Sequence, residues 1–526
     1  MTGEISRSRL SLHVTALLIF AFAALLRVGL LNAPGEFDEF YHLLAARGLM
    51  DSGLPRILDG EYWRGALFTR MVAGLFRLTG SDDLPVARVI SVIAGSLIPV
   101  VVFLWISKVV GTGTAALATA FTIFWPQGIL ESQLARFYAL HVLTFLLGAV
   151  AFYLLVAGGV SSRLIYAALT ALGWTLAIHF QISAVIGIGA ACLGGIFVLV
   201  MRERINPVAT LLLLSPLIVL GVIAAVALDA ASVLARAWEF YRWTPVHSEH
   251  LRNYYAFYFQ QFETWYGLLW FASLALVPLG LRANQTLAIY CATIFVLCFL
   301  AHSFGGMKSL RYMSYATPFL FVNWALGIRV LVGDLTRRFS ARTRNTVIIL
   351  SGILVVVATL FVPRSLQLAS GEGLPDRGDW SDGAAIVGEW LEEAPFIVTT
   401  RELHQIAYLG DYDVLFSESR QSELSPPEDF GVDQRTGRPV VGTEQNMMLV
   451  IRCAPDGLLV TSPDWWYDAG FNQRLGRQMD AEGILFDIRE GDAIVAVRWH
   501  HDDNSPAACE TLPRTLRTTP PEDVIP

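Results

Sequence analysis

Residues Gly35 to His42 read Gly-Glu-Phe-Asp-Glu-Phe-Tyr-His, and this stretch follows directly on the first long apolar run of the chain. Two adjacent carboxylates, Asp38 and Glu39, therefore stand where a membrane span is expected to end. Carboxylates in hydrocarbon must be neutralised or paired, because removing a charge from water is costly. We therefore predict that this pair lies at a wet mouth on the outer face of a membrane domain.

The composition indicates a membrane protein with many spans. Of 526 residues, 54% are hydrophobic and 16% are charged, with a mean hydropathy of +0.51, whereas soluble proteins carry roughly a quarter charged residues. From Arg364 onward the chain has 29 acidic and 13 basic residues, although its overall charge is only −7. We predict a basic transmembrane domain at 1–363, an acidic soluble domain at 364–502 and a disordered tail at 503–526.

Eleven apolar runs approach the ~20 residues that a helix needs to cross the bilayer core. The basic residues between them gather on alternate turns, which places the N-terminus in the cytoplasm and the acidic domain outside. Two outer segments, Asp38–Met50 and Tyr62–Leu78, have the periodicity of helices that lie on a membrane surface. The predicted spans are 11–31, 87–108, 113–127, 138–158, 164–179, 183–201, 207–229, 264–281, 286–302, 313–333 and 345–363.

The acidic domain alternates helical and strand-like runs, which predicts a Rossmann-like α/β sheet. No glycine-rich phosphate fingerprint follows a strand, so no nucleotide site is predicted. Cys453 and Cys509 can pair if this domain lies outside the cytoplasm. Helices are expected at 381–393 (capped by Ser381), 444–453 and 464–481, and strands at 396–400, 414–416, 457–461, 483–488 and 493–499.

Charged residues of the first outer loop are the first candidates for chemistry. Transfer to a hydroxyl or carboxylate acceptor needs a base and a cation that holds the leaving group. Asp38 or Glu39 can be that base, or both can simply cap the helix that begins there. Arg64 can bind a lipid-linked phosphate or snorkel to lipid headgroups. Arg27, at the outer end of the first span, is expected to pair with one of the two acids.

Two further outer loops carry charges of both signs. Glu131 and Arg136 lie five residues apart between two predicted spans, where they can face a cavity or merely close the loop. Lys308 and Arg311 oppose the positive-inside trend, and an anionic ligand is the simplest reason for them. Three loops thus bring acids and bases to one membrane face, above a bundle large enough to hold a lipid tail.

These residues resemble motifs of the GT-C fold glycosyltransferases, in particular the protein O-mannosyltransferase and lipid A aminoarabinose transferase branch. Arg27 and the Asp38-Glu39 pair match an arginine and an acidic pair at the end of span one in those proteins. Arg64-Gly65-Ala66-Leu67 stands where members have a Lys-Pro-Pro-Leu-type segment, and it keeps the charge but loses the prolines.

Later segments of the chain carry the same resemblance. Lys308, Arg311, Tyr312 and Pro318 fit a Lys-x-x-Arg-Tyr motif that is followed by a proline in the next span. Glu131 takes the place of an acid in the second loop, and Arg136-Phe137-Tyr138 is similar to a variant in bacterial and archaeal members. The resemblance covers residues 10–363.

The resemblance implies an inverting transferase of a bacterial or archaeal plasma membrane that uses a polyprenyl-phosphate-linked sugar. Asp38 would be the general base, and Glu39 and Glu131 would orient the acceptor or a cation. The donor phosphate would be held by the basic residues of the loops, with support from Arg27 and Tyr312. These basic residues are Arg64, Arg136, Lys308 and Arg311.

No metal is expected to be required, although Asp38 and Glu131 would hold one if it were. The acceptor would be a lipid, a glycan or a protein, and no nucleic-acid partner is expected. A flippase for lipid-linked sugars is an alternative, but it would show inverted repeats and mid-membrane charges. An O-antigen-ligase-like enzyme would show a large late outer loop, whereas the late loop here is short.

Overall fold

The computed structural model describes residues 2–158, 162–202, 214–221, 229–244, 246–336, 361–372, 378–423 and 430–502, with single residues in between. The chain divides into two compact units. The first unit is Met1–Asn32 with Arg88–Leu374, and the second is Ala33–Ala87 with Pro375–Pro526. The predicted division placed the segment 33–87 with the membrane domain, whereas the contacts group it with the C-terminal part of the chain.

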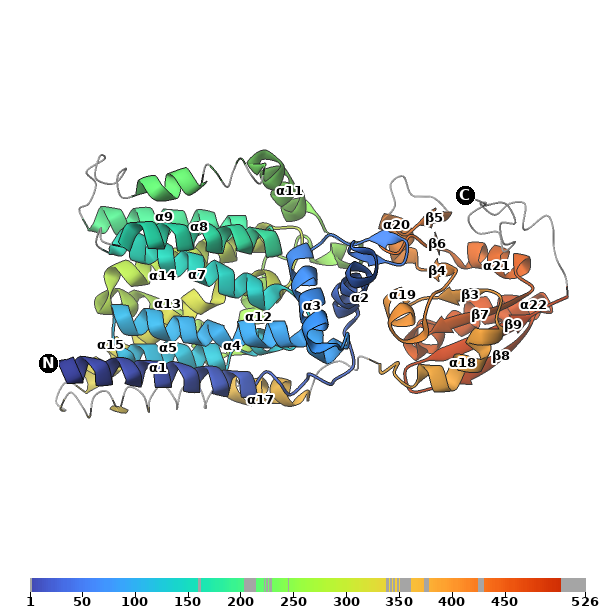
Figure 1. Cartoon of the computed structure of the whole chain (residues 1–526), viewed down its shortest axis with the longest axis horizontal. Helices are drawn as coiled ribbons and strands as arrows, with labels where there is room; N and C mark the ends of the chain where they lie inside the picture. The colour runs from blue at the N-terminus through green and yellow to red at the C-terminus, as the bar shows by residue number, and fades with distance from the viewer. Residues whose placement is uncertain are drawn as a thin grey trace. The chain divides into compact units, whose positions relative to one another are not determined.

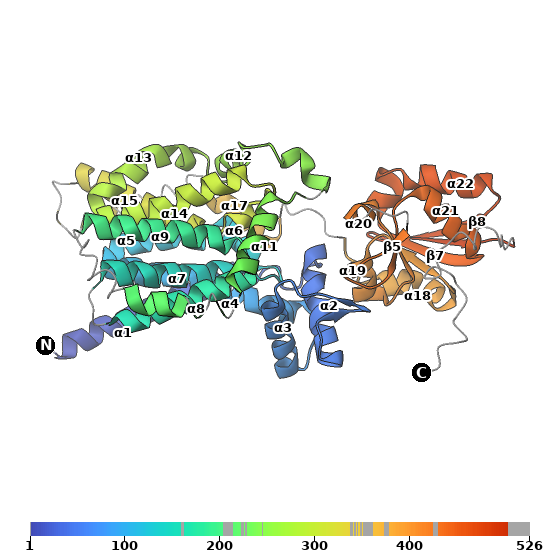
Figure 2. The ribbon, with the colours of Figure 1, turned by 90° about the horizontal axis from the view of Figure 1, so that it is seen from above.

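The first unit consists of helices. Figures 1 and 2 show α7, α8 and α9 running side by side. Its helices are α1 (Thr2–Leu25), α4 (Leu84–Val109), α5 (Thr112–Ile123), α6 (Pro126–Ser132), α7 (Tyr138–Ala157), α8 (Arg163–Phe180), α9 (Ala184–Met201), α11 (Ala230–Arg242), α12 (Phe257–Tyr266), α13 (Leu268–Ala283), α14 (Gln285–Phe304), α15 (Thr317–Leu335) and α17 (Phe361–Ser370), with short turns η2 (Val246–Leu251) and η3 (Leu310–Tyr312).

Six of the described helices, α4, α7, α8, α9, α14 and α15, are long and apolar enough to cross a membrane. Helices α12 and α13 form a seventh candidate span that is bent by 101°. Gly267 stands at the bend with φ of +50°, which glycine adopts without a steric penalty. The predicted spans 207–229 and 345–363 fall largely outside the described residues. The protein is thus a multi-pass membrane protein, with six or seven of the eleven predicted spans recognised.

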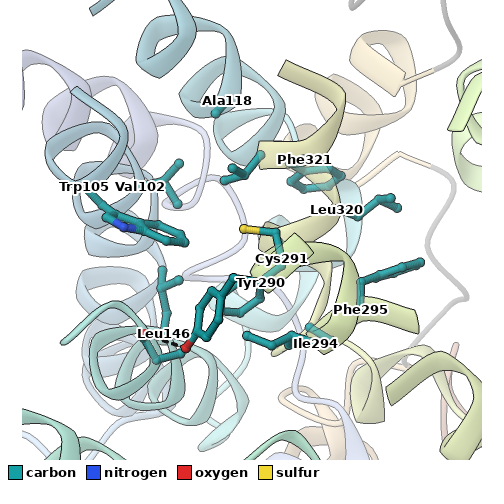
Figure 3. Close-up of a cluster of buried hydrophobic side chains, with 14 of the residues drawn as sticks. Val102, Trp105, Ala118, Leu146, Tyr290, Cys291, Ile294, Phe295, Leu320 and Phe321 are labelled. Carbon is teal, nitrogen blue, oxygen red and sulfur yellow. Dashed lines mark hydrogen bonds between the residues drawn. The ribbon is translucent and has the colours of Figure 1, made fainter. Parts of the chain in front are cut away.

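Small and aromatic residues pack the interior of this bundle. A Cβ atom added to Gly173 of α8 would lie 2.7 Å from the backbone nitrogen of Gly148 in α7, so only glycine permits this close approach. Figure 3 shows Trp105, Tyr290 and Phe321 from three different helices converging on one buried cluster. The Tyr290 hydroxyl donates a hydrogen bond of 2.8 Å to the Ala149 carbonyl, which satisfies it inside the apolar core.

The second unit combines residues 33–87, which were predicted as the first outer loop, with the C-terminal sheet. The loop forms α2 (Phe37–Ser52), the hairpin β1 (Arg56–Ile57) and β2 (Gly60–Glu61), and α3 (Ala66–Thr79). The C-terminal part contains β3 (Ile397–Thr399), β4 (Val414–Phe416), β5 (Phe430–Val432), β6 (Pro439–Val441), β7 (Asp456–Thr461), β8 (Leu485–Glu490) and β9 (Val495–His500). Its helical elements are α18 (Gly383–Glu393), α19 (Glu402–His404), η4 (Gln405–Leu409), α20 (Glu418–Glu423), α21 (Glu444–Cys453), η5 (Asp464–Asp468), η6 (Asn472–Gly476) and α22 (Arg477–Ala481).

The strands form one sheet in the order β5-β6-β4-β3-β7-β9-β8, with parallel pairing from β6 to β7 and antiparallel pairing at both edges. Alternate residues of β7 point to opposite faces, as strand geometry requires. Leu458 and Val460 pack with Trp390 of α18, whereas Leu459 packs with Met447 of α21. Helices therefore cover both faces of a sheet with a parallel centre.

Two local predictions for this domain are wrong. The helix predicted at 381–393 begins at Gly383, and its N-cap is Asp382 instead of Ser381. The helix predicted at 464–481 is broken into η5, η6 and α22. Cys453 is disulfide-bonded, whereas Cys509 and the predicted tail lie outside the described residues.

Candidate active site

In the second unit, the acidic pair lies in the first turn of α2. Glu39 is fully buried and its Oε2 accepts a hydrogen bond of 2.8 Å from the Glu36 backbone nitrogen, in a capping box that fixes the start of the helix. This geometry supports the capping interpretation for Glu39, and its catalytic role stays a prediction. Asp38 is half-buried, so its carboxylate is the better placed of the two to reach a ligand.

Helical spacing places two ring residues next to Asp38, since Tyr41 and His42 follow it by three and four positions. His42 is buried, and its Nδ1 lies 3.0 Å from the Thr69 hydroxyl of α3. Burial, and secondly the positive charge of Arg64, lowers the pKa of His42 to about 3. His42 is therefore neutral at physiological pH, and Arg64 acts electrostatically on a residue one turn from Asp38.

Arg64 itself is exposed and directly precedes α3. The N-cap of α3 is Gly65, with φ of +62°, a left-handed conformation that favours glycine. This positive φ explains why glycine follows Arg64 in this chain. A proline, which stands at this position in the GT-C proteins that the segment resembles, could not adopt it. The structure thus keeps the predicted cation on a tight turn between β2 and α3.

In the first unit, Glu131 of α6 is buried and held by two side chains. Its Oε1 accepts hydrogen bonds from Gln127 Nε2 at 2.8 Å and from the Ser314 hydroxyl. Burial raises the pKa of Glu131 to about 8, although both hydrogen bonds and the charge of Arg311 act in the opposite direction. Among the described residues, Oε2 has no hydrogen-bond partner. A carboxyl group in this state is mostly protonated at neutral pH and can donate a hydrogen bond.

Two of the predicted cations meet at Tyr138, the first residue of α7. The Cζ atoms of Arg136 and Arg311 lie 5.3 and 5.4 Å from the centroid of its ring, within the range of cation–π attraction. Because Arg311 also acts on Glu131, the structure brings together three of the predicted residues, from two separate loops. Tyr138 and Ser314 complete this cluster. Tyr138 belongs to the Arg136-Phe137-Tyr138 motif, but no role was predicted for it or for Ser314.

Lys308 has a local structural role. Its ammonium donates hydrogen bonds to the carbonyls of Ser303, at 2.6 Å, and Gly305 at the C-terminal end of α14. A cation at this position is stabilised by the helix dipole. Burial lowers the pKa of Lys308. Donor binding by Lys308 stays a prediction.

Arg27 is buried, with its Nη1 2.9 Å from the Ala23 carbonyl and its Nε 3.3 Å from the Ser132 hydroxyl. These hydrogen bonds go to neutral oxygens, so the predicted pairing with an acid is not seen among them. Gly95 of α4 makes room for this contact, since an added Cβ would overlap the Ser132 hydroxyl.

A cavity of about 380 Å³ lies in the first unit between α9, α11 and the end of α14. Tyr312 and Gly305 line it, so a residue that accepts a hydrogen bond from Lys308 and the residue after Arg311 both belong to its wall. The other lining residues are Ile182, Ser183, Val185, Ile186, Leu234, Ala237, Trp238, Phe240, Tyr241, Ala301, His302 and Met307. The wall is mainly apolar, with a few polar groups.

In the described part of the chain, no group of three or more His, Cys, Asp or Glu side chains could hold a metal ion. The expectation that the reaction requires no metal stays a prediction.

No family model and no curated protein matches this sequence. Solved structures do match it: ArnT from Cupriavidus metallidurans bound to undecaprenyl phosphate has a TM-score of 0.55 and 13% identity, over 94% of this chain and 98% of ArnT. The chain has the GT-C fold. In the apo state ArnT has a TM-score of 0.56 and 12% identity, over 96% of this chain and 99% of ArnT.

A third structure is the Archaeoglobus fulgidus oligosaccharyltransferase tethered with an acceptor peptide, at a TM-score of 0.45 and 13% identity, over 74% of this chain and 62% of that one. The predicted resemblance to the GT-C fold is thus confirmed by the match to ArnT. At this level of identity the likeness concerns the fold, and the substrate has to be argued from the site.

Proposed function

We propose that this protein is an inverting glycosyltransferase that moves a sugar from a polyprenyl-phosphate carrier to an acceptor outside the plasma membrane of a bacterium or archaeon. The observation that carries the proposal is the match over nearly the whole of ArnT, which was solved with undecaprenyl phosphate bound. The chemistry of the two residue groups described above is the second support.

In this proposal Asp38 takes the proton from the acceptor oxygen. That oxygen then attacks the anomeric carbon, and the bond from this carbon to the phosphate oxygen breaks. The electron pair of that bond leaves with the polyprenyl phosphate. Configuration is inverted because a single displacement occurs on the face of the sugar opposite the leaving phosphate. Positive groups that meet the leaving phosphate stabilise the charge that develops on it. We assign this role to Arg64, Arg136, Lys308 and Arg311.

The protonation state of Glu131 suits a hydrogen-bond donor better than a base. With its pKa raised to about 8 by burial, it can donate to an oxygen of the acceptor or of the phosphate at neutral pH. Glu39 is held in the cap of α2, so we assign the proton transfer to Asp38. The two carboxyl groups, Asp38 and Glu131, thus have different roles because their surroundings differ.

The cavity supports a lipid-linked donor. Its apolar wall suits the first isoprene units of a polyprenyl chain, while Tyr312 and the Lys308-binding carbonyl of Gly305 mark one part of the wall. An apolar pocket with a few convergent polar groups is the usual form of a small-molecule site. The disulfide of Cys453 favours an oxidising compartment for the C-terminal sheet, which supports the outward orientation.

The test is sugar transfer by the full-length protein in proteoliposomes, from a panel of radiolabelled polyprenyl-phosphate sugars. Asp38→Asn keeps the shape of the side chain and removes the base, so kcat should fall by roughly 10²–10⁴-fold. Asp487→Asn, an exposed carboxylate on β8, is the matched control and should leave kcat unchanged. Turnover that survives EDTA would support a metal-independent reaction.

Two outcomes contradict the proposal. If no donor is turned over while labelled lipid moves between leaflets, the protein is a flippase. If turnover is unaffected by Asp38→Asn, another group is the base.

A further inference from the structure

Tyr41 of α2 lies between two arginines from the C-terminal part of the second unit. Arg420 of α20 donates a hydrogen bond from its Nη2 to the Tyr41 hydroxyl, and Arg435, in the turn between β5 and β6, donates from its Nη1 at 2.6 Å. The Arg435 guanidinium also lies 5.3 Å from the centroid of the Tyr41 ring. We refer to Arg420 and Arg435 as the Tyr41 clamp.

Two buried acids lie beside the clamp. Glu402, 3% exposed, lies 3.4 Å from Arg420, and Asp433, 6% exposed, accepts a hydrogen bond from the Arg435 backbone nitrogen at 3.3 Å. Both acids also act electrostatically on Tyr41. Each arginine residue thus already donates a hydrogen bond to an acid side chain of its own unit. A satisfied buried network of this kind makes its surroundings rigid.

The β5–β6 turn, which carries Arg435, also forms hydrogen bonds with the β1–β2 turn. The Asp59 backbone nitrogen donates to the Thr436 carbonyl at 3.1 Å, and Arg438 Nη1 lies 2.7 Å from Asp59 Oδ2. A Cβ added to Gly60 would lie 2.3 Å from the Arg435 backbone, so the β1–β2 turn and the β5–β6 turn are in close contact. The segment between α2 and α3 is therefore fixed to the sheet as well.

The clamp matters for Asp38 because Tyr41 and Asp38 lie on the same helix. Tyr41 follows Asp38 by three residues, so both lie on the same side of α2. The Tyr41 ring stacks on Tyr62, with centroids 4.8 Å apart and planes at 8°, and Tyr62 stands two residues before Arg64. The contacts of the Tyr41 side chain therefore hold the same turn of α2 that carries Asp38.

We propose that Arg420 and Arg435 are positioning residues, which hold Tyr41 so that Asp38 is fixed for proton transfer. The inference rests on the proposed function, because it takes Asp38 as the base. It gives the C-terminal sheet the task of holding the catalytic helix in place. An Asp38 side chain that moves by ~1 Å would lose on the order of 10- to 100-fold in rate.

Three variants test the clamp in the full-length protein. Tyr41→Phe removes the hydroxyl and keeps the stacked ring, while Arg420→Gln and Arg435→Gln each remove a donor charge. Each should lower kcat by roughly 10- to 100-fold and leave the KM of donor and acceptor within about twofold, because a positioning defect acts on the chemical step. Arg435→Lys, which keeps the charge, should recover part of the loss.

The control variant is Arg452→Gln. Arg452 also pairs with an acid of this unit, Glu482, but it does not contact α2 in the described structure, so kcat should not change. In the double variant Tyr41→Phe/Arg435→Gln, the loss of kcat should stay well below the product of the two single losses, because both changes remove the hydrogen bond at the Tyr41 hydroxyl. Additive losses would overturn the proposal.

Hydrogen exchange of the Phe37–Ser52 amides gives a readout without turnover. Clamp variants should exchange faster in α2 than wild type or Arg452→Gln, because a less firmly held helix opens more often. Unchanged exchange with unchanged kcat would overturn the inference, and a raised acceptor KM at constant kcat would assign the arginines to acceptor binding instead. If wild type turns over no donor, the proposed function fails, and hydrogen exchange still decides whether the clamp holds α2.

Discussion

The two units satisfy their buried cations in different ways. In the helical unit, Arg27 and Lys308 donate to backbone carbonyls, which carry no formal charge. In the unit with the sheet, Arg420 and Arg438 pair with carboxylates. Helix ends supply unpaired carbonyls and a dipole that favours a cation, whereas a domain with many acids supplies neutralising partners. For the proposed function we therefore expect the cations of the helical unit to keep more of their positive charge for a phosphate.

Substitution of Arg311 is expected to have the largest effect on transfer, and it tests the comparison between the two units directly. Arg311→Ala should lower kcat/KM for the donor by roughly 10²–10³-fold, as expected when a group that stabilises developing charge is lost. Arg282→Ala removes a half-exposed cation of the same unit that pairs with Asp334, and it should have no effect on transfer. Initial rates at varied donor concentration measure both. Equal effects of the two variants would contradict a phosphate site in the helical unit.

Glu131→Gln should produce a smaller change, visible mainly in pH dependence. The pKa of Glu131 is raised to about 8 in the folded protein, above its usual value of 4.5. Its contribution to stability is therefore complete below pH ~4.5 and is lost as the pH rises through ~8. Glutamine imitates the protonated acid, so the variant should keep its activity near pH 7 and lose less stability than wild type between pH 5 and 9.

Thermal unfolding and transfer rates across this pH range check the prediction for Glu131. The contrary result would be a variant with the same pH dependence of stability as wild type. In that case the carboxyl group would be ionised in the folded protein, and its assignment as a hydrogen-bond donor would be wrong.

Glu402→Gln should give the smallest effect, in the other unit. Burial raises the pKa of Glu402 to about 7, while the charge of Arg420 opposes the shift. Stability from this group is likewise lost as the pH rises from ~4.5 through ~7, but over a narrower range than for Glu131. Unfolding followed at pH 5, 6, 7 and 8 should show a flatter profile in the variant. A profile steeper than that of wild type would show that Glu402 is ionised and stabilising throughout.

Some elements follow from local sequence alone. The apolar runs found six or seven spans, because a helix in hydrocarbon must satisfy its backbone within itself and reach a fixed length. The strands β3, β4 and β7 lie close to their predicted positions, since short apolar runs between turn residues form buried strands. The sequence also predicted the start of α2 to within one residue, because acidic residues are stabilised in the first turn of a helix.

The helix predicted at 464–481, by contrast, is interrupted at Gly470, whose φ is +71°. Trp466, Phe471 and Leu475 are all buried in the core of the sheet, and no helical periodicity announces the π-helical turns around them. Likewise, Ser381 and Asp382 are both good N-cap residues, and local sequence does not choose between neighbours of this kind. The roles of Tyr138 and Ser314 were missed for a related reason, since each depends on a charged group from another loop.

By itself, the sequence indicated the helical membrane domain and the α/β class of the C-terminal part, and it nominated the charged residues of the proposed site. Only the tertiary structure decided which of them meet. The Tyr41 hydroxyl binds arginines 379 and 394 positions away, and Glu131 binds a serine 183 positions away. Local propensity and periodicity act over a few residues, whereas such contacts depend on how whole elements pack. That is why the first outer loop could be recognised as helical but not as part of the C-terminal unit.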